Sequence, residues 1–209
     1  MPAVACNIRG YSFNFRFVGE NEAEFVGYCV DARRSRFMVQ VFAEGLLSVF
    51  GHDPVIAVRG FVGHLKFMRG TLDEASLRMS VKADSLAVAS SMSRKDRQEI
   101  ERIMFAEVLE VAKYPEIVYV STKVTPRRVD EREYQVRIEG RLALHGVTRD
   151  APINAHVSFD ADGQLRARGR FSLRQRDYLI KPVAVAAGAL RVRDELKLSF
   201  DISAIERAD

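Results

Sequence analysis

The sequence has only two cysteines and no tryptophan in 209 residues. Two cysteines are too few for a disulfide framework, and neither Cys6 nor Cys29 belongs to a CxxC pair, so thiol redox and zinc–thiolate chemistry are disfavoured. No apolar run approaches the roughly 20 residues that a transmembrane helix needs. We therefore expect a soluble protein without a bound metal.

The first 26 residues also lack the pattern of a secretion signal, which is a basic start followed by a long apolar core. Polar residues such as Asn7, Arg9 and Asn14 interrupt each apolar stretch there. The simplest interpretation is a cytoplasmic protein. A periplasmic location is the alternative if the N-terminus has been assigned wrongly.

The composition is that of an ordinary globular domain with a mild positive charge. Hydrophobic residues make up 47%, charged residues 29%, and the formal net charge is +4. Such a chain can fold around a core. The charge permits contact with an anionic membrane surface but falls short of a polybasic nucleic-acid-binding domain.

Apolar and polar residues alternate with a period of two through most of the chain, which predicts strands. The segments with this pattern are 37–41, 75–83, 118–124, 134–144, 153–159, 165–174 and 196–202. Gly60 and Gly63 favour a bent strand within 55–67, and the Asp-Ala-Asp-Gly sequence at 160–163 predicts a turn. About eight strands predict an all-β fold, an antiparallel eight-stranded barrel of lipocalin-like type.

One segment breaks this pattern. Arg94 to Val111 carries apolar residues at helical spacing among charged ones, which predicts an inserted amphipathic helix against the barrel or over its mouth. Ser93 and Asp96 form a capping pair, and the helix must end before Pro115. In the strand after this proline, the alternation places four residues on one face: Val118, Val120, Thr122 and Val124.

We divide the chain into an N-terminal arm (1–26), one barrel domain (27–205) and a short C-terminal tail (206–209). In the arm, Tyr11 to Phe17 alternates aromatic and mostly polar residues, so it could form an extra edge strand. Such a strand could pair with a second copy of the chain and give a homodimer.

The four histidines show no zinc-protease spacing. On the strand pattern, His64 and His156 fall on polar faces and are expected to be solvated. His52 and His145 lie at strand ends, and with Asp53 they could meet at one rim of the barrel. This suggests a rival hypothesis of a hydrolase-like enzyme or a metal site. The alternative, which we favour, is that these histidines hydrogen-bond to turns.

Arginines share the outer face of one strand at Arg166, Arg168, Arg170 and Arg174, and Arg176 follows. Arg137 and Arg141 on a neighbouring strand could extend this stripe. Pairing with acidic neighbours such as Glu133, Glu139 or Asp160 would make this stripe an ordinary solvated surface. The functional alternative is docking to anionic lipid headgroups. Nucleic acid is disfavoured because no aromatic residues for base stacking lie between the arginines.

Three stretches taken together resemble the YceI-like family of bacterial proteins. They are Lys113 to Ile117 with the Ser-Thr pair at 121–122, the run Gly140 to Arg149 with its His-Gly-x-Thr-basic element, and Gly169 to Tyr178. The similarity covers about Tyr28 to Ala204. The sequence differs from many members in lacking a secretion signal, and its Gly-His element at 51–52 resembles only a subset of the family.

The resemblance implies a barrel that binds an isoprenoid-like or other long-chain lipid, such as an isoprenoid quinone or a fatty acid, without a cofactor or covalent change. Alternation alone is equally compatible with a filled core. A structural or stress-response barrel without a ligand is thus a further alternative. From the alternation we expect eleven residues to line the cavity: Phe61, Leu65, Phe67, Leu77, Met79, Val81, Val136, Ile138, Leu142, Leu165 and Phe171.

Overall fold

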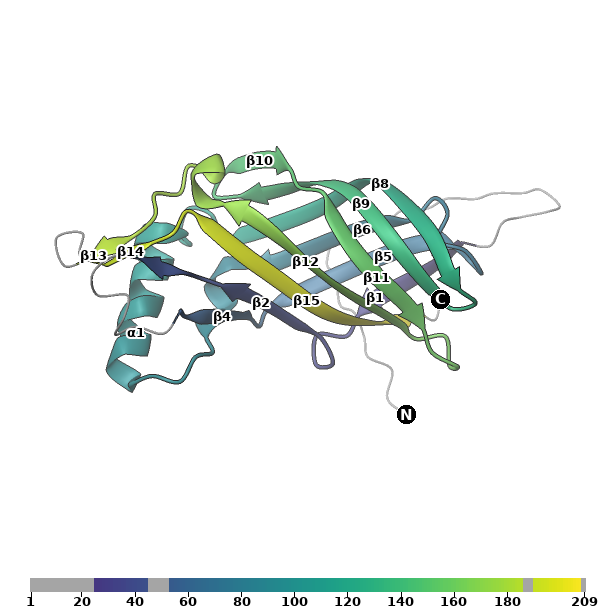
Figure 1. Cartoon of the computed structure of the whole chain (residues 1–209), viewed down its shortest axis with the longest axis horizontal. Helices are drawn as coiled ribbons and strands as arrows, with labels where there is room; N and C mark the ends of the chain where they lie inside the picture. Colours follow the sequence, from purple (N-terminus) through teal and green to yellow (C-terminus); the bar gives the residue numbers. More distant parts are fainter. Residues whose placement is uncertain (1–24, 45–52, 186–189, 208–209) are drawn as a thin grey trace.

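The structure is a computed structural model that describes residues 25–44, 53–185 and 190–207. Eight antiparallel strands close into a barrel because the last strand pairs back to the first (Figure 1). In spatial order they are β1 (Phe25–Val30), β5 (Phe61–Met68), β6 (Ser76–Lys82), β8 (Glu116–Asp130), β9 (Glu133–Leu144), β11 (Ile153–Phe159), β12 (Leu165–Arg174) and β15 (Glu195–Glu206). The predicted all-β fold of eight strands with one inserted helix is confirmed. The proposed edge strand at Tyr11 to Phe17 lies outside the described residues.

Three of these strands continue past a short interruption. The continuations are β2 (Arg36–Gln40), β4 (Val55–Val58) and β7 (Leu86–Val88), and they pair in the order β15-β2-β4-β7. The break between β6 and β7 is a 3-10 turn, η2 (Ala83–Ser85), and it lies beside the break between β4 and β5 at 59–60. Backbone hydrogen bonds tie the two breaks together, from Lys82 N to Gly60 O at 2.8 Å and from Arg59 N to Ser85 O at 3.2 Å. A Cβ on Gly60 would lie 2.7 Å from that of Ser85, so the predicted bend needs this glycine.

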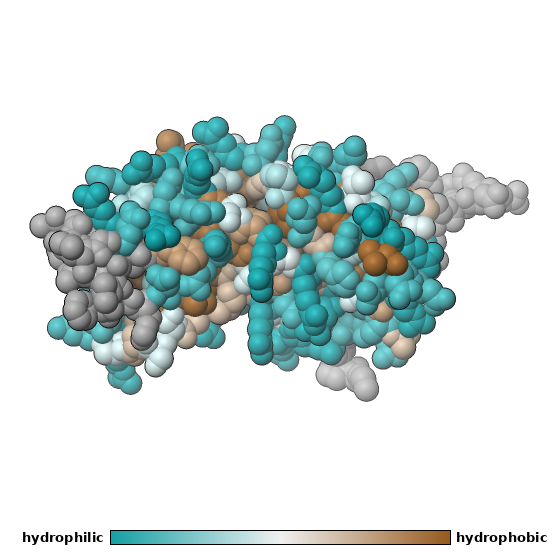
Figure 2. Space-filling model, viewed as in Figure 1, coloured by the Kyte–Doolittle hydropathy of each residue, from teal (hydrophilic) through white to brown (hydrophobic). Residues whose placement is uncertain are grey.

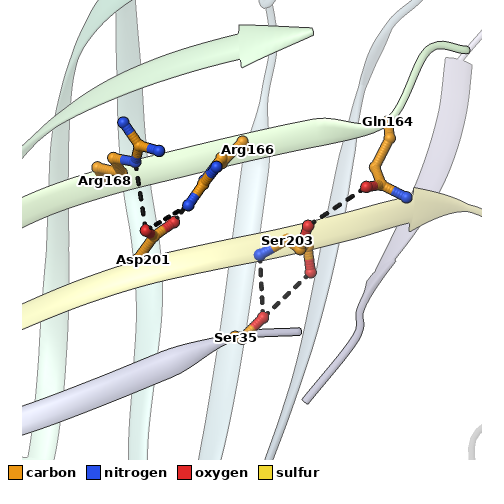
Figure 3. Close-up of polar contacts among 6 residues, drawn as sticks. All are labelled: Ser35, Gln164, Arg166, Arg168, Asp201 and Ser203. Carbon is orange, nitrogen blue, oxygen red and sulfur yellow. Dashed lines mark hydrogen bonds and ion pairs between the residues drawn. The ribbon is translucent and has the colours of Figure 1, made fainter. Parts of the chain in front are cut away.

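The break between β1 and β2 is held by a buried serine pair (Figure 3). The Ser35 hydroxyl accepts a hydrogen bond from the backbone N–H of Ser203 at 2.9 Å and donates to the Asp31 carbonyl at 2.7 Å. Both serines are buried. The pair fills the gap in the ladder at which β15 changes its neighbour from β1 to β2.

One end of the barrel, the hairpin end, consists of the loops 69–75, 131–132 and 160–164. Inside it, Tyr28, Phe67, Tyr134 and Phe159 pack as an aromatic cluster with ring centroids 5.0–6.4 Å apart. The Tyr28 hydroxyl donates to the Gly163 carbonyl at 2.8 Å. Aromatic packing and this hydrogen bond close the hairpin end.

The opposite end, the helix end, carries the remaining short elements (Figure 1). They are α1 (Arg94–Ile103), the wide π-helical turn η3 (Met104–Val108), β10 (Val147–Asp150), the 3-10 turn η4 (Gln175–Tyr178) and a small sheet of β3 (Ala43–Glu44), β13 (Ala184–Val185) and β14 (Leu190–Val192). The face of the molecule that Figure 2 shows is mostly hydrophilic, with smaller apolar patches.

The helix begins as predicted but ends earlier. The Ser93 hydroxyl accepts from Asp96 N at 3.1 Å, which is the expected cap. After Ile103 the helix widens, and Leu109 N bonds to Met104 O. Glu110 then takes a left-handed φ of 45°, so the chain turns away before Val111. The wide turn brings Val108 and Leu109 to the barrel interior.

The sequence pattern placed Val118, Val120, Thr122 and Val124 of β8 on one face. Of these four, only Val124 lines the barrel interior. Ser121 pairs with Gly140 and Lys123 with Glu139, so Thr122 is an extra residue in a β-bulge. The bulge reverses the alternation: Tyr119 is buried and Val120 is exposed. Gly140 makes room for the Tyr119 ring, because a Cβ there would lie 2.7 Å from the Val120 carbonyl oxygen and also clash with the tyrosine.

His145 joins three elements of the helix end. It occupies the two-residue turn between β9 and β10 with a φ of 52°, followed by Gly146 at 75°. Its Nδ1 lies 3.2 Å from the Tyr178 carbonyl of η4, and its Nε2 lies 2.9 Å from the Glu110 carboxylate beyond η3. Both partners are acceptors when Glu110 is ionised, so the ring donates to both only in its protonated form. The predicted turn-binding role of this histidine is confirmed.

Replacing Tyr119 with phenylalanine should change how stability depends on alkaline pH. Burial raises the pKa of Tyr119 to about 12, whereas an unfolded tyrosine titrates near 10. The unfolded state therefore loses its proton first, and the tyrosine's contribution to stability declines as pH rises from about 10 to about 12. The stability difference between wild type and Tyr119→Phe should shrink over this window in urea unfolding. A stability difference that stays constant over this pH range would contradict the prediction.

Replacing His145 with asparagine should destabilise the protein although asparagine suits the turn better. Asn-Gly is a favoured sequence for a two-residue hairpin turn with two positive φ values. The asparagine side chain, however, is too short to bridge Glu110 and the Tyr178 carbonyl. We expect a loss of about 1–2 kcal/mol in the free energy of unfolding, measured by urea titration at neutral pH. Glu110→Gln should lose part of the same energy. Unchanged stability of His145→Asn would show that the bridge contributes nothing.

Candidate functional site

An apolar cavity occupies the barrel between the aromatic cluster and the helix end. The space open to the centres of water-sized molecules is about 230 Å³. Among the described residues, its lining includes three polar ones, Ser76, Tyr119 and Gln175, and no charged one. An apolar cavity of this kind stays dry and accepts apolar guests.

The wall follows from the strand alternation. Every second residue of β6, β9, β11, β12 and β15 turns inward, and these inward residues are almost all aliphatic or aromatic. Three of the described wall residues are alanines: Ala75, Ala155 and Ala167. Their short side chains leave space that leucine or phenylalanine would fill.

Ten of the eleven residues expected to line the cavity lie on its wall: Leu65, Phe67, Leu77, Met79, Val81, Val136, Ile138, Leu142, Leu165 and Phe171. Phe61 does not. It is buried in a second core cluster with Val58 and Ile202, because it directly follows the bend at Arg59 and Gly60. Contact of the ten with a ligand stays a prediction.

Sequence reasoning left several wall residues out of the site. Phe37 and Val39 of β2 and Leu198 and Phe200 of β15 face the cavity, and alternation alone could have nominated them. Tyr119 was concealed by the bulge in β8. Three further residues come from outside the barrel strands and carry no periodic signal: Leu72, Leu109 and Ile180. Val108 also lines the cavity, and it belongs to the apolar stripe of the predicted helix.

Two of the three polar lining side chains are engaged with the backbone. The Tyr119 hydroxyl donates to the Ala151 carbonyl at 3.1 Å. The Gln175 amide donates to the Arg193 carbonyl at 2.9 Å. These contacts support the barrel and give the cavity wall no group arranged for acid–base chemistry.

The residues of the rival enzyme hypothesis do not form a dyad in the described part of the chain. Both ring nitrogens of His145 face structural partners. Asp53 is exposed before β4, where its carbonyl oxygen accepts from Gln40. His52 lies outside the described residues. Among those described, no group of three His, Cys, Asp or Glu side chains could hold a metal ion.

The other two histidines differ in burial. His156 is half exposed and lies 3.3 Å from a Glu133 carboxylate oxygen, as expected for a surface histidine. His64 is not solvated as predicted. Its Nδ1 lies 3.5 Å from the Cys29 sulfur, and its buried Nε2 has no hydrogen-bond partner among the described residues. Burial, with Arg207 and Arg78 nearby, lowers the pKa of His64, which favours the neutral form of the ring.

The arginine stripe on β12 is partly neutralised at its hairpin-end half, but not by the expected residues. Asp201 of β15 lies between Arg166 and Arg168, with oxygen–nitrogen distances of 2.7 and 3.3 Å (Figure 3). The Arg166 hydrogen bonds lower the pKa of Asp201, which keeps it ionised. The predicted pairing with Glu133, Glu139 or Asp160 is therefore wrong for these two arginines. Glu139 instead lies 3.7 Å from Arg137.

Within the described residues, no helix combines the length and the apolar character that crossing a membrane would require.

Solved structures share this fold at low sequence identity. BcnA of Burkholderia cenocepacia superposes with a TM-score of 0.64 at 13% identity, covering 84% of this chain and 99% of that protein. A polyisoprenoid binding domain from Saccharophagus degradans, implicated in plant cell wall breakdown, gives 0.62 at 12% identity, with coverage of 87% and 99%. The YceI protein of Campylobacter jejuni gives 0.53 at 11%, with coverage of 96% and 94%.

No curated protein matches the chain by sequence. The sequence profile of the YceI-like domain, however, matches residues 28–204, the span over which the motifs at 113–122, 140–149 and 169–178 suggested a resemblance. This match covers most of the chain and includes every strand from β2 to β14. The chain therefore belongs to the YceI-like domain family.

Proposed function

We propose that this protein binds the hydrocarbon chain of one amphiphilic lipid, of isoprenoid-like type, inside its barrel and releases it unchanged. The observation that carries the proposal is the cavity of about 230 Å³, in whose lining the described part of the chain places no charged residue. The structural similarity to a polyisoprenoid binding domain supports an isoprenoid chain. An isoprenoid quinone or a fatty acid fits the same requirement for a long apolar chain.

The cavity sets the direction in which such a ligand lies. The aromatic cluster closes the hairpin end, and a charged or strongly polar headgroup would lose its hydration without finding a partner inside. The hydrocarbon therefore lies toward the hairpin end and the headgroup lies at the helix end. Each buried CH₂ contributes roughly 0.8 kcal/mol, so a chain of moderate length offsets the cost of association.

A solid structural barrel is disfavoured by the cost of the empty space. Cavities in cores reduce stability by about 24 cal/mol per Å³, so a permanently empty cavity of about 230 Å³ corresponds to a cost of roughly 5 kcal/mol. That is comparable to the whole stability of many domains. A ligand that fills the space recovers part of this energy.

Protein purified from its native host should carry a lipid. Native mass spectrometry should show an adduct that organic extraction removes, and the emptied protein should bind geranylgeraniol and cis-parinaric acid in fluorescence titrations. The apolar lining accounts for both results, since it recognises hydrocarbon without a specific polar contact. An emptied barrel that binds neither probe would refute the proposal.

Enlarging small wall residues should block the ligand without unfolding the protein. Ala155→Met and Ala167→Met each fill cavity space that about two or three CH₂ groups of the ligand would occupy. Because each of these groups contributes roughly 0.8 kcal/mol when buried, the Kd for cis-parinaric acid should rise at least tenfold. Ala161→Met, in the exposed turn at 160–163, is the matched control and should bind normally. Thermal unfolding of the ligand-free wall variants should occur at or above the wild-type temperature. Unaltered binding by both wall variants would place the ligand elsewhere.

A further inference from the structure

Leu179 is held in a conformation and an environment that do not suit leucine. It is 74% exposed, and its backbone has φ 58° and ψ 20°, in the left-handed region. Glycine or asparagine fills such positions at lower cost, and a polar residue would suit the exposure. Its neighbours Tyr178 and Ile180 are 3% and 4% exposed, so the chain is anchored on both sides and Leu179 projects between the anchors.

This projection lies at the rim of the lipid cavity. Leu179 directly follows η4, which continues from β12 at the helix end. Gln175 at the start of η4 and Ile180 just after Leu179 both line the cavity. The bridge from His145 to the Tyr178 carbonyl fixes the loop to the barrel. Leu179 is thus one residue away from the cavity wall and faces solvent.

Exposed cations lie on the segments next to Leu179. Arg176 and Lys181 flank it in the sequence, Arg149 donates to the Asp177 carbonyl at 3.1 Å, and Lys113 lies over the Tyr114 ring, which packs on His145. Within the described residues none of these four cations forms an ion pair, in contrast to Arg166 and Arg168 farther along β12.

The opposing carboxylates are fewer. Asp177 lies in η4 beside Leu179, the Asp194 carboxylate accepts from the backbone N–H of Arg176 at 2.9 Å, and Glu110 is engaged by His145, which gives three carboxylates against four cations. The rim therefore presents an apolar tip inside a field of net positive charge. Scattered single apolar side chains are ordinary on protein surfaces, but this one is strained, flanked by cations and contiguous with an apolar cavity.

We propose that this rim docks on the surface of an anionic lipid bilayer. Leu179 inserts among the acyl chains just below the headgroups, and Lys113, Arg149, Arg176 and Lys181 contact lipid phosphates. Charge complementarity and continuity with the cavity identify the partner, because a lipid moving between bilayer and barrel at this point need not cross water. The role in lipid exchange rests on the proposed function, whereas the docking itself does not.

Vesicle flotation tests the docking without any bound cargo. Wild-type protein should float with phosphatidylcholine vesicles that contain phosphatidylglycerol, and hardly at all with phosphatidylcholine alone. Leu179→Asn keeps the left-handed backbone but removes the apolar tip, and it should lower the vesicle partition coefficient about tenfold. Arg176→Gln and Lys181→Gln should each lower it about fivefold, an effect that salt reduces.

Matched controls lie at the other end of the barrel. Val129 is an exposed apolar residue of β8, and Arg127 is an exposed arginine of the same strand. Val129→Asn and Arg127→Gln should therefore float like wild type. Equal flotation of Leu179→Asn and Val129→Asn would overturn the docking proposal, as would equal binding to vesicles with and without phosphatidylglycerol.

Uptake of cis-parinaric acid separates this proposal from the proposed function. With vesicles as the donor, Leu179→Asn should take up the probe several-fold more slowly, whereas its equilibrium affinity for the probe in buffer should equal that of wild type. Flotation without probe binding would support the docking and refute the lipid-binding function. Probe binding together with flotation that is insensitive to Leu179→Asn would support the lipid-binding function and refute the docking.

Discussion

The pairing of β15 with β12 on one edge and with both β1 and β2 on the other is the constraint on which the molecule depends. It closes the sheet, and closure removes the free edges that an open sheet would expose. Closure also fixes which residues face inward, since side chains alternate along every strand. The buried serine pair at Ser35 and Ser203 lies where β15 passes from one neighbour to the next, so the weakest point of the ladder is hydrogen-bonded rather than left to water.

From this constraint follows the contrast between interior and exterior. The inward positions enclose an apolar cavity, and the outward positions carry charges that are partly paired across strands, as Arg166 and Arg168 are with Asp201. The same strand thus supplies wall residues such as Ala167 and Phe171 and a polar outer surface. A change of register by one residue would exchange the two sets, so the hollow interior and the hydrophilic surface share one cause.

The sequence was sufficient to predict this pattern where the alternation is uninterrupted. The strands at 134–144, 153–159 and 165–174 have the predicted inward faces, and the wall residues on them follow. The prediction failed where the backbone departs from ideal geometry. Thr122 adds a residue to β8, and the wide turn after Ile103 ends the helix early. Both depend on partners distant in sequence, which a local pattern does not contain. The cytoplasmic location and the homodimer through 11–17 stay predictions.

The two ends of the barrel differ in how they are held, and this difference favours the helix end as the place where the proposed ligand would enter. At the hairpin end, buried aromatic rings and a tyrosine–carbonyl bond close the interior beneath long paired strands. The helix end is held by weaker means: α1 has no fully buried residue, the paired strands of the small sheet have two or three residues, and His145 supplies a polar bridge. Elements with little buried apolar surface open locally at lower free energy than a barrel wall does. Opening at the helix end breaks a few hydrogen bonds and leaves the closed sheet intact, so exchange of a hydrocarbon chain at this end is compatible with a stable fold.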